Sequence, residues 1–234
     1  MKRIAINTVT LALTAALLPF SPAIAQQQQQ QQQQGQASQA AHAHASPAST
    51  PMATTGIGTW APAAASVTIP ANSVYQVPTP LTDAAGQRFV LKDLAGVPLL
   101  ATMFYGDCHS ACPIVIETLK RTVGALGADG KRLRVLLISL DPKRDTPKSL
   151  AMMADVQKLD PAQYRLAVAA NDTDTRVLAA ALDIRYRPLD NGEISHTTRI
   201  ALLNADGSVR ADSSKLTVDP DPEFVKQIAT ALKR

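Results

Sequence analysis

The chain has 234 residues, of which 46% are hydrophobic and 18% charged, and its formal net charge is +4. This length supports one sizeable core, whereas 23 basic against 19 acidic residues, without a basic cluster and with only one Trp, four Tyr and four Phe, argue against a nucleic-acid-binding protein. No apolar run reaches the roughly 18 residues that a membrane-spanning helix needs, and two cysteines cannot staple a disulfide scaffold.

The N-terminus has the pattern of a cleaved export signal. Lys2 and Arg3 precede an apolar stretch over residues 4–18, and residues 23–25, Ala-Ile-Ala, have the small-residue form that signal peptidases cut. We therefore predict a signal peptide over residues 1–25 and a mature protein in an oxidising compartment, the bacterial periplasm. The alternative is an uncleaved stretch that anchors the chain in the membrane.

The next segment has too few large apolar side chains to build a core. It opens with an unbroken glutamine run and continues in Ala, Ser, Thr, Pro and Gly. We predict a linker over residues 26–68, with Trp60 marking where it begins to touch a folded domain at 69–234. His42 and His44 belong to this linker and are either part of its biased composition or a weak auxiliary copper or zinc site.

In the folded domain we expect strands and helices to alternate. The first half holds a hairpin of strands at 74–77 and 88–90, a buried strand at 98–105, a helix from Cys108 and a buried strand at 133–140. The second half holds a helix capped by Asp145 with Pro147 in its first turn, a strand at 165–169, a helix capped at 171–174, a hairpin of strands at 199–203 and 208–211, and a final helix striped from Val225 to Leu232. This order predicts an α/β fold, a thioredoxin-like central mixed sheet flanked by helices with an N-terminal hairpin.

Two cysteines, Cys108 and Cys112, follow the predicted strand at 98–105. If the helix begins near Cys108, the two sulfurs lie on one face of its first turn. A helix N-terminus favours thiolate over thiol, and a thiolate pair suits a soft metal such as Cu(I). The pair can also close to a disulfide and act as a redox couple, although a loop this short would stabilise the fold little.

The predicted domain contains two histidines, His109 and His196. His196 lies in a polar turn before the strand at 199–203, and a thioredoxin-like fold packs that turn beside the cysteine loop. Its imidazole would complete a site of two sulfurs and one nitrogen, which stabilises Cu(II) as well as Cu(I). The alternative is a structural histidine. We expect His109, between the cysteines, to point outward.

Four segments together resemble the Sco/SenC family of copper-handling proteins, over about 160 residues from Val74 to the C-terminus. They are Cys-His-Ser-Ala-Cys-Pro at 108–113 after a strand that ends in Phe-Tyr-Gly, Ile-Ser-Leu-Asp-Pro-Lys-Arg-Asp-Thr-Pro at 138–147, Ser-His at 195–196 before a strand, and Leu-Asn-Ala-Asp-Gly at 203–207. Any one of them would be weak evidence, but their combination is specific.

The resemblance implies one copper ion bound by Cys108, Cys112 and His196. It implies a metallochaperone that delivers copper to, and/or reduces the cysteines of, the binuclear copper centre of cytochrome c oxidase. The implied partners are the copper-centre subunit of that oxidase, a thioredoxin-like periplasmic reductant and other copper chaperones, and no nucleic acid. Two features depart from the family pattern: a cleaved signal with a glutamine-rich tail in place of an anchor, and His-Ser-Ala between the cysteines.

Two aspartates in the segment 138–147 have different interpretations. Asp145 is interpreted as a helix cap. Asp141 lies at the carboxyl end of a parallel strand, where ligands gather in open α/β sheets. It therefore either supports the metal ligands from behind or forms a plain turn with Pro142.

Three alternatives to a metallochaperone stay open. A thiol-disulfide oxidoreductase would use the same cysteine chemistry, but its usual Cys-x-x-Cys spacing is one residue shorter and the chain has no proline directly before the strand at 199–203. A peroxiredoxin would need Thr where the chain has Tyr105. A periplasmic copper buffer or redox sensor would bind the metal without donating it. Enzymatic thiol-disulfide reductase activity is left undecided.

Overall fold

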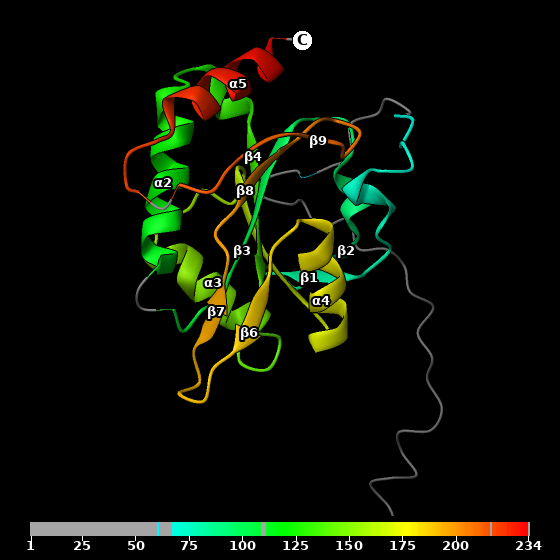
Figure 1. Ribbon diagram of the computed structural model, residues 1–234, viewed down its shortest axis with the longest axis vertical. Coiled ribbons are helices and arrows are strands. Elements are labelled where there is room, and N and C mark those ends of the chain that lie inside the picture. The colour runs from blue at the N-terminus through cyan, green and yellow to red at the C-terminus, as the bar shows by residue number, and fades with distance from the viewer. Residues whose placement is uncertain (1–59, 61–66, 109–110, 216, 234) are drawn as a thin grey trace, which may run out of the picture. The chain divides into compact units, whose positions relative to one another are not determined.

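A computed structural model describes residues 60, 67–108, 111–215 and 217–233 of the chain (Figure 1). The predicted signal peptide and most of the predicted linker lie outside the described residues, as do His42, His44 and His109. All described residues belong to the unit Thr55–Arg234. Within them, every helix is too short or too polar to cross a lipid bilayer.

The secondary structure follows the predicted alternation, with one additional hairpin. The strands are β1 (Leu81–Asp83), β2 (Arg88–Phe89), β3 (Leu99–Phe104), β4 (Arg134–Ser139), β5 (Tyr164–Ala169), β6 (Tyr186–Pro188), β7 (Ile194–His196), β8 (Ile200–Leu203) and β9 (Val209–Ser213). The α-helices are α2 (Ala111–Ala125), α3 (Pro147–Val156), α4 (Asp172–Ala181) and α5 (Pro222–Leu232). Three short 3₁₀ helices are η1 (Val74–Gln76), η2 (Leu91–Leu94) and η3 (Asp129–Arg132).

A seven-stranded mixed sheet in the order β2-β1-β5-β4-β3-β8-β9 forms the centre, and β6 and β7 pair separately. β3, β4 and β5 are parallel, whereas β1, β8 and β9 pair antiparallel with their neighbours. Because crossovers between parallel strands are right-handed, α2 and α3 lie on the same face of the sheet. In Figure 1, α5 joins them and α4 covers the other face. The predicted thioredoxin-like fold class is confirmed.

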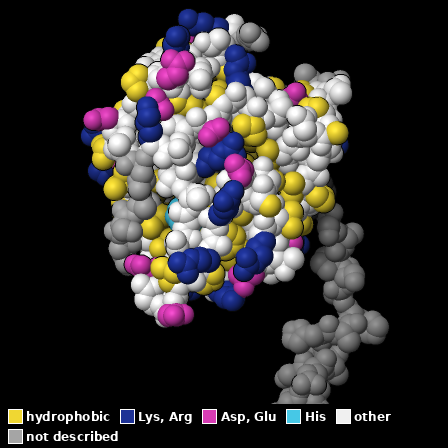
Figure 2. Space-filling view, in the orientation of Figure 1, with side chains coloured by type: hydrophobic (Ala, Val, Ile, Leu, Met, Phe, Trp, Pro, Cys, Tyr) yellow, Lys and Arg dark blue, Asp and Glu magenta, His cyan; other side chains and the backbone are white. Residues whose placement is uncertain are grey.

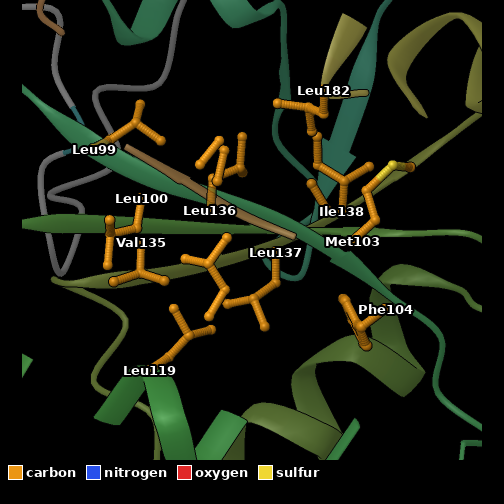
Figure 3. Packing of buried hydrophobic residues seen from close by; sticks show 14 of the residues in the cluster. Leu99, Leu100, Met103, Phe104, Leu119, Val135, Leu136, Leu137, Ile138 and Leu182 are labelled. Carbon is orange, nitrogen blue, oxygen red and sulfur yellow. The ribbon is translucent and has the colours of Figure 1, made fainter. Parts of the chain in front are cut away.

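The core lies along β3 and β4, whose side chains are buried on both faces of the sheet. Leu99, Leu100, Val135 and Leu136 are inaccessible to solvent. Figure 3 shows these side chains interleaved above and below the strands, with Leu119 of α2 closing one side. Central parallel strands covered by helices on both faces have such continuous apolar runs, which explains why both strands could be predicted from the sequence.

Two capping predictions had different outcomes. Asn171 caps α4, and its side chain accepts a hydrogen bond from the Asp174 N–H at 2.9 Å, as expected. The cap of α3 is Thr146, whose hydroxyl accepts from the Ser149 N–H at 3.2 Å. The prediction that Asp145 caps this helix is therefore wrong by one residue, because the Asp145 carboxylate is engaged elsewhere.

The predicted N-terminal hairpin exists, but its first strand lies later in the chain. β1 pairs with β2, whereas Val74–Gln76 forms the 3₁₀ helix η1. The Ser73 hydroxyl caps this turn, accepting from the Tyr75 N–H at 3.0 Å and donating to the Asp206 carbonyl at 2.6 Å. Val74 and Tyr75 are both buried at consecutive positions, which a one-face strand pattern does not produce.

The hairpin of β6 and β7 was not predicted. Residues 193–198 were expected to be a turn, but His196 is the last residue of β7 and pairs with Tyr186 of β6. β6 is only three residues long and its Arg187 and Pro188 are exposed. It therefore lacks the apolar alternation by which strands are found in a sequence.

Trp60, one of the few described residues of the predicted linker, contacts the folded unit. The Trp60 indole N–H donates to the Pro161 carbonyl at 3.0 Å. The Arg134 and Arg165 guanidinium groups lie over its ring, 5.3 Å and 5.7 Å from the centroid. These contacts agree with the expectation that Trp60 touches the domain.

Candidate metal and thiol site

Cys108 and Cys112 lie between the end of β3 and the first turn of α2. Both are buried, reduced thiols. The Cys112 N–H donates to Cys108 Sγ at 3.2 Å, so this sulfur takes the place that an oxygen acceptor has in an ordinary helix cap. Cys108 itself is not helical. The helix thus begins at Ala111 and not at Cys108 as predicted, so the two cysteines meet through this hydrogen bond and not as two positions on one helical face.

The protonation of Cys112 differs from the expectation. Burial raises the pKa of its thiol above the ordinary value, and the hydrogen bond to Cys108 raises it further, whereas the Tyr105 N–H acts in the opposite direction. The loss of solvation thus outweighs the attraction of a helix N-terminus for a thiolate. Cys112 stays protonated until a metal or an electrophile displaces its proton.

His196 presents a neutral imidazole with a defined tautomer. Burial lowers the pKa of its ring, so the ring is neutral at pH 7. Its Nδ1 lies 3.1 Å from the Thr197 carbonyl oxygen. Because a carbonyl only accepts, Nδ1 carries the proton and donates it, which leaves the Nε2 lone pair for a metal.

Tyr105 lies in contact with both predicted ligand groups. Its ring meets the His196 ring edge to face, with the centroids 6.1 Å apart. Burial raises the pKa of its hydroxyl, so the group stays protonated. The neighbouring Cys108 side chain also raises the pKa of this hydroxyl, whereas the Ile194 N–H of β7 lowers it. Tyr105 thereby connects the cysteine loop to the strand that carries His196.

The structure brings the two sulfurs together but does not gather all three predicted ligands. Across the part of the chain that is described, no three His, Cys, Asp or Glu side chains are grouped so that they could hold a metal ion. The donor set nevertheless suits copper in chemistry, since it offers two sulfurs and a neutral imidazole with a free nitrogen. The assignment of Cys108, Cys112 and His196 as ligands stays a prediction.

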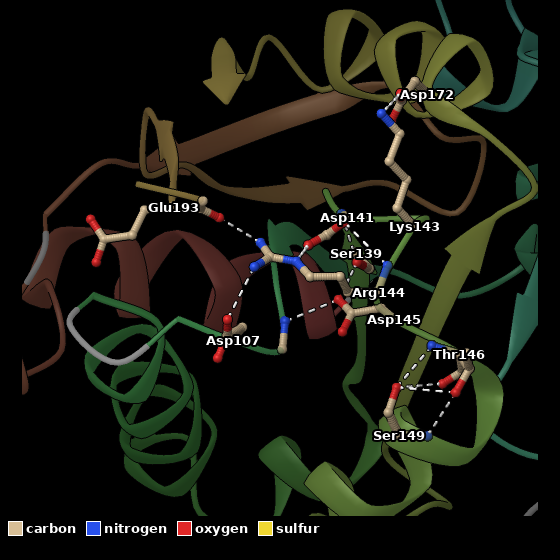
Figure 4. Close-up of polar contacts among 12 residues, drawn as sticks. Asp107, Ser139, Asp141, Lys143, Arg144, Asp145, Thr146, Ser149, Asp172 and Glu193 are labelled. Carbon is tan, nitrogen blue, oxygen red and sulfur yellow. Dashed lines mark hydrogen bonds and ion pairs between the residues drawn. The ribbon is translucent and has the colours of Figure 1, made fainter. Parts of the chain in front are cut away.

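Arg144 fastens the segments that carry these residues to one another (Figure 4). It forms an ion pair with Asp141 at the end of β4, and its Nη1 lies 3.0 Å from Asp107 Oδ2, next to Cys108. Its Nη2 donates to the Gly192 carbonyl at 2.8 Å, in the turn of the β6–β7 hairpin. One guanidinium group thus holds the hairpin with His196 against the loop with Cys108.

A second carboxylate supports the same loop from inside. Asp145 Oδ2 accepts from the Gly106 N–H at 2.9 Å and from the Ser139 hydroxyl. Burial raises the pKa of Asp145, whereas these two donors lower it. A Cβ atom on Gly106 would lie 2.3 Å from Asp145 Oδ1, so any larger residue would force the carboxylate or the loop to move. We call the residues Ser139, Asp141, Arg144 and Asp145 the polar anchor.

Asp141 acts on the site through Arg144. It is buried, and besides the ion pair its Oδ1 accepts from the Arg144 backbone N–H at 3.3 Å. Asp141 is linked to Cys108 by two successive ion pairs, from Asp141 to Arg144 and from Arg144 to Asp107, which precedes Cys108 in the chain. Asp141 thus holds Arg144 in place, and Arg144 in turn holds Asp107 beside Cys108. That Asp141 thereby orients the metal ligands stays a prediction.

Sequence reasoning missed the roles of Tyr105, Gly106 and Arg144. In the sequence, Tyr105 and Arg144 are recognised as members of two motifs, and Tyr105 also argues against a peroxiredoxin, but neither is assigned a contact. One signal was available for Arg144, because it stands between two aspartates at the end of a buried strand. The partners of Gly106 and Tyr105 are distant in sequence and needed the fold.

The face shown in Figure 2 carries interspersed charges. Lys and Arg side chains alternate with Asp and Glu over this surface, and apolar areas lie between them. This mixture is what a chain with nearly balanced charges produces.

Comparison with known proteins identifies relatives over the folded domain. A family model described as SCO1/SenC matches residues 70–233. A candidate copper-binding protein of Stutzerimonas stutzeri is 29% identical over 138 residues, which is 56% of this chain and 64% of that protein, slightly less than two thirds of its length.

Solved structures agree with the fold. ScoI of Bradyrhizobium japonicum with copper bound is 26% identical with a TM-score of 0.53, over 67% of this chain and 96% of that one. BsSco, described as a member of the Sco family of cytochrome c oxidase assembly proteins, is 20% identical with a TM-score of 0.56, over 68% of this chain and 92% of that one. The prediction of copper is confirmed at the level of these relatives. Because the family model spans more than half of the chain, the protein belongs to the SCO1/SenC family.

Proposed function

We propose that this protein binds one copper ion through Cys108, Cys112 and His196 and serves the binuclear copper centre of cytochrome c oxidase. It delivers copper to that centre, reduces the centre's cysteines, or does both. The observation that carries the proposal is the pair of reduced cysteines in contact at the start of α2, with the Cys112 N–H 3.2 Å from Cys108 Sγ. Relatives named for copper binding and for oxidase assembly support the metal and the destination.

Binding begins at the sulfurs and ends with the imidazole. Copper displaces the thiol protons of Cys108 and Cys112, and these protons leave to solvent. His196 then adds its Nε2, for which the imidazole and the two sulfurs must come closer together than they lie in this structure. The donors are soft enough for Cu(I), and the added nitrogen accommodates Cu(II).

The test of the ligand set compares the two oxidation states. We expect His196→Ala to weaken Cu(II) binding far more than Cu(I) binding, measured by competition with chelators. We also expect a sulfur-to-Cu(II) charge-transfer band in the wild-type protein that either Cys108→Ser or Cys112→Ser abolishes. An equal loss of both oxidation states in the histidine variant, or no loss, would contradict the imidazole ligand.

Thiol reduction is the second candidate, and the same sulfur contact favours it. In this reaction Cys108 and Cys112 give two electrons and two protons to a partner disulfide, which becomes two thiols while their own disulfide forms. The Cys108–Cys112 disulfide form would then bind copper only weakly and would need a thioredoxin-like reductant. Mixing the reduced metal-free protein with an oxidised copper-centre domain and counting thiols on each partner separates reduction from delivery.

We place this activity in the periplasm, after removal of residues 1–25. The support is the export-signal pattern of the N-terminus. Mass spectrometry of the protein from fractionated cells should find the mature chain beginning at Gln26 in the soluble periplasmic fraction. An intact N-terminus in the membrane fraction would instead show an anchored form.

A further inference from the structure

A groove of about 360 Å³ opens beside the two cysteines, on the side where α2 faces α3. Four sulfur-bearing side chains line it: Cys108, Cys112, Met152 and Met153. Apart from Gln157, its other lining side chains are apolar. We call this feature the sulfur groove. Among the described residues that line it, the metal-binding side chains are thiols and thioethers, which is the donor type that selects Cu(I) over harder ions.

The methionines that line this groove are more exposed than the thiols. Met152 is 61% exposed, whereas Cys108 is 7% exposed and Cys112 is 2% exposed. Met153, the next residue of α3, is half-buried and packs against the core. A methionine used to fill a gap in a core is buried, as Met103 of β3 is at 2%. Filling a gap in the core therefore does not explain why Met152 is at this position.

We propose that Met152 and Met153 form a Cu(I)-binding subsite that receives the ion and passes it to Cys108 and Cys112. This inference rests on the proposed copper function and adds a route of entry to it. Thioethers bind Cu(I) without losing a proton. In the transfer the copper–thioether bonds break, copper–sulfur bonds to the cysteines form, each thiol releases its proton to solvent, and the copper stays Cu(I).

The first experiment observes the subsite without its acceptor. The full chain with Cys108→Ser and Cys112→Ser, labelled with ¹³C at the methionine methyl groups, is titrated with Ag(I) as a redox-inert substitute for Cu(I). We expect the Met152 and Met153 signals to shift first. Met103, buried in the core, and Met52, elsewhere in the chain, are internal controls. Unshifted Met152 and Met153 signals, or shifts that coincide with that of Met52, would overturn the proposal.

The second experiment keeps both cysteines and does not depend on the serine variant. Met152→Leu with Met153→Leu preserves side-chain volume and removes both thioethers. We expect Cu(I) uptake from a soluble chelate to slow by about tenfold, with the final copper content unchanged. Val177→Ala, which trims an exposed apolar side chain of α4, is the control and should not change the rate.

The outcomes separate the two proposals. If the wild-type protein loads copper and the double leucine variant loads it equally fast, the methionine subsite is wrong and the copper function stands. If the wild-type protein takes up no copper at its cysteines, the proposed function is wrong. Methyl shifts at Met152 and Met153 in the first experiment would then show that the thioethers bind the ion, but the proposed transfer to the cysteines would be wrong.

Discussion

The two sides of the cysteine loop are built by different physics. On one side the polar anchor holds the loop with directional contacts, in which Asp145 binds Gly106 and Arg144 binds Asp107. On the other side the sulfur groove offers apolar and sulfur-bearing side chains, with Met152 largely exposed. Hydrogen bonds fix positions, whereas thioethers and alkyl chains permit adjustment. The polar anchor therefore positions the cysteine loop, and the sulfur groove leaves the loop accessible from the other side.

Of the changes that test this difference, removal of the buried Asp145 carboxylate should lower the stability of the protein most. Asp145→Ala leaves the Gly106 N–H and the Ser139 hydroxyl without their shared acceptor in a buried site. We expect the free energy of unfolding to fall by about 3 kcal/mol, measured by urea denaturation. Asp145→Asn keeps a side-chain oxygen and should lose less. Equal losses in the two variants would show that the acceptor oxygen is not what stabilises the loop.

The second largest loss of stability should follow from adding a single carbon atom at Gly106. Gly106→Ala places a Cβ 2.3 Å from Asp145 Oδ1 and 3.3 Å from its Cγ, so the loop or the carboxylate must move. We expect a loss of about 2 kcal/mol in unfolding free energy. Gly124→Ala is the control, because its Cβ would meet nothing within 4 Å and lies in a helix. The control should stabilise the protein slightly, and an equal effect at both glycines would contradict the packing argument.

Loss of Arg144 should affect the metal more than the fold. Its side chain is 43% exposed, so Arg144→Ala should cost less than about 1 kcal/mol of stability. We expect Cu(II) affinity to fall by about tenfold, because the hairpin with His196 is no longer held to the loop. Arg121→Ala removes a comparably exposed arginine with two acidic partners, Glu117 and Asp219, away from the site. If both variants bind Cu(II) alike, Arg144 does not position the histidine.

The smallest change in stability should come from the sulfur groove. Met152→Leu with Met153→Leu exchanges side chains of similar volume at exposed and half-buried positions. We expect the unfolding free energy to change by less than about 1 kcal/mol, measured by the same urea method. A loss as large as that of Asp145→Ala would show that the methionines serve the fold, and the contrast between the two sides would fail.

The parts of the fold that could be predicted are those with a strong local pattern. The apolar run of β3 and the Asn171 cap of α4 each have a pattern within a few residues, and both are confirmed. The four-residue spacing of Cys108 and Cys112 likewise indicated that they meet, although the contact is a hydrogen bond from the Cys112 N–H to the sulfur of a residue that precedes the helix.

The parts that could not be predicted depend on partners far along the chain. Asp145 resembles a helix cap from its neighbours, but its main partner is Gly106, 39 residues away. Nothing in a spacing rule shows that the Tyr105 ring contacts His196. The three-residue strands β6 and β7 have too few residues for a periodic pattern. In each case tertiary contacts decide what the local sequence leaves open.

The contact between Arg144 and the hairpin turn has a consequence for how the protein can diverge. The acceptor is the main-chain carbonyl of Gly192, and a main-chain oxygen is present whichever side chains a turn carries. The side chains at neighbouring positions of that turn can therefore change, for example to suit different docking surfaces, while the hydrogen bond to Arg144 is kept. On the side of the hairpin turn, the link to the cysteine loop therefore depends on the identity of Arg144 and not on the side chains of the turn.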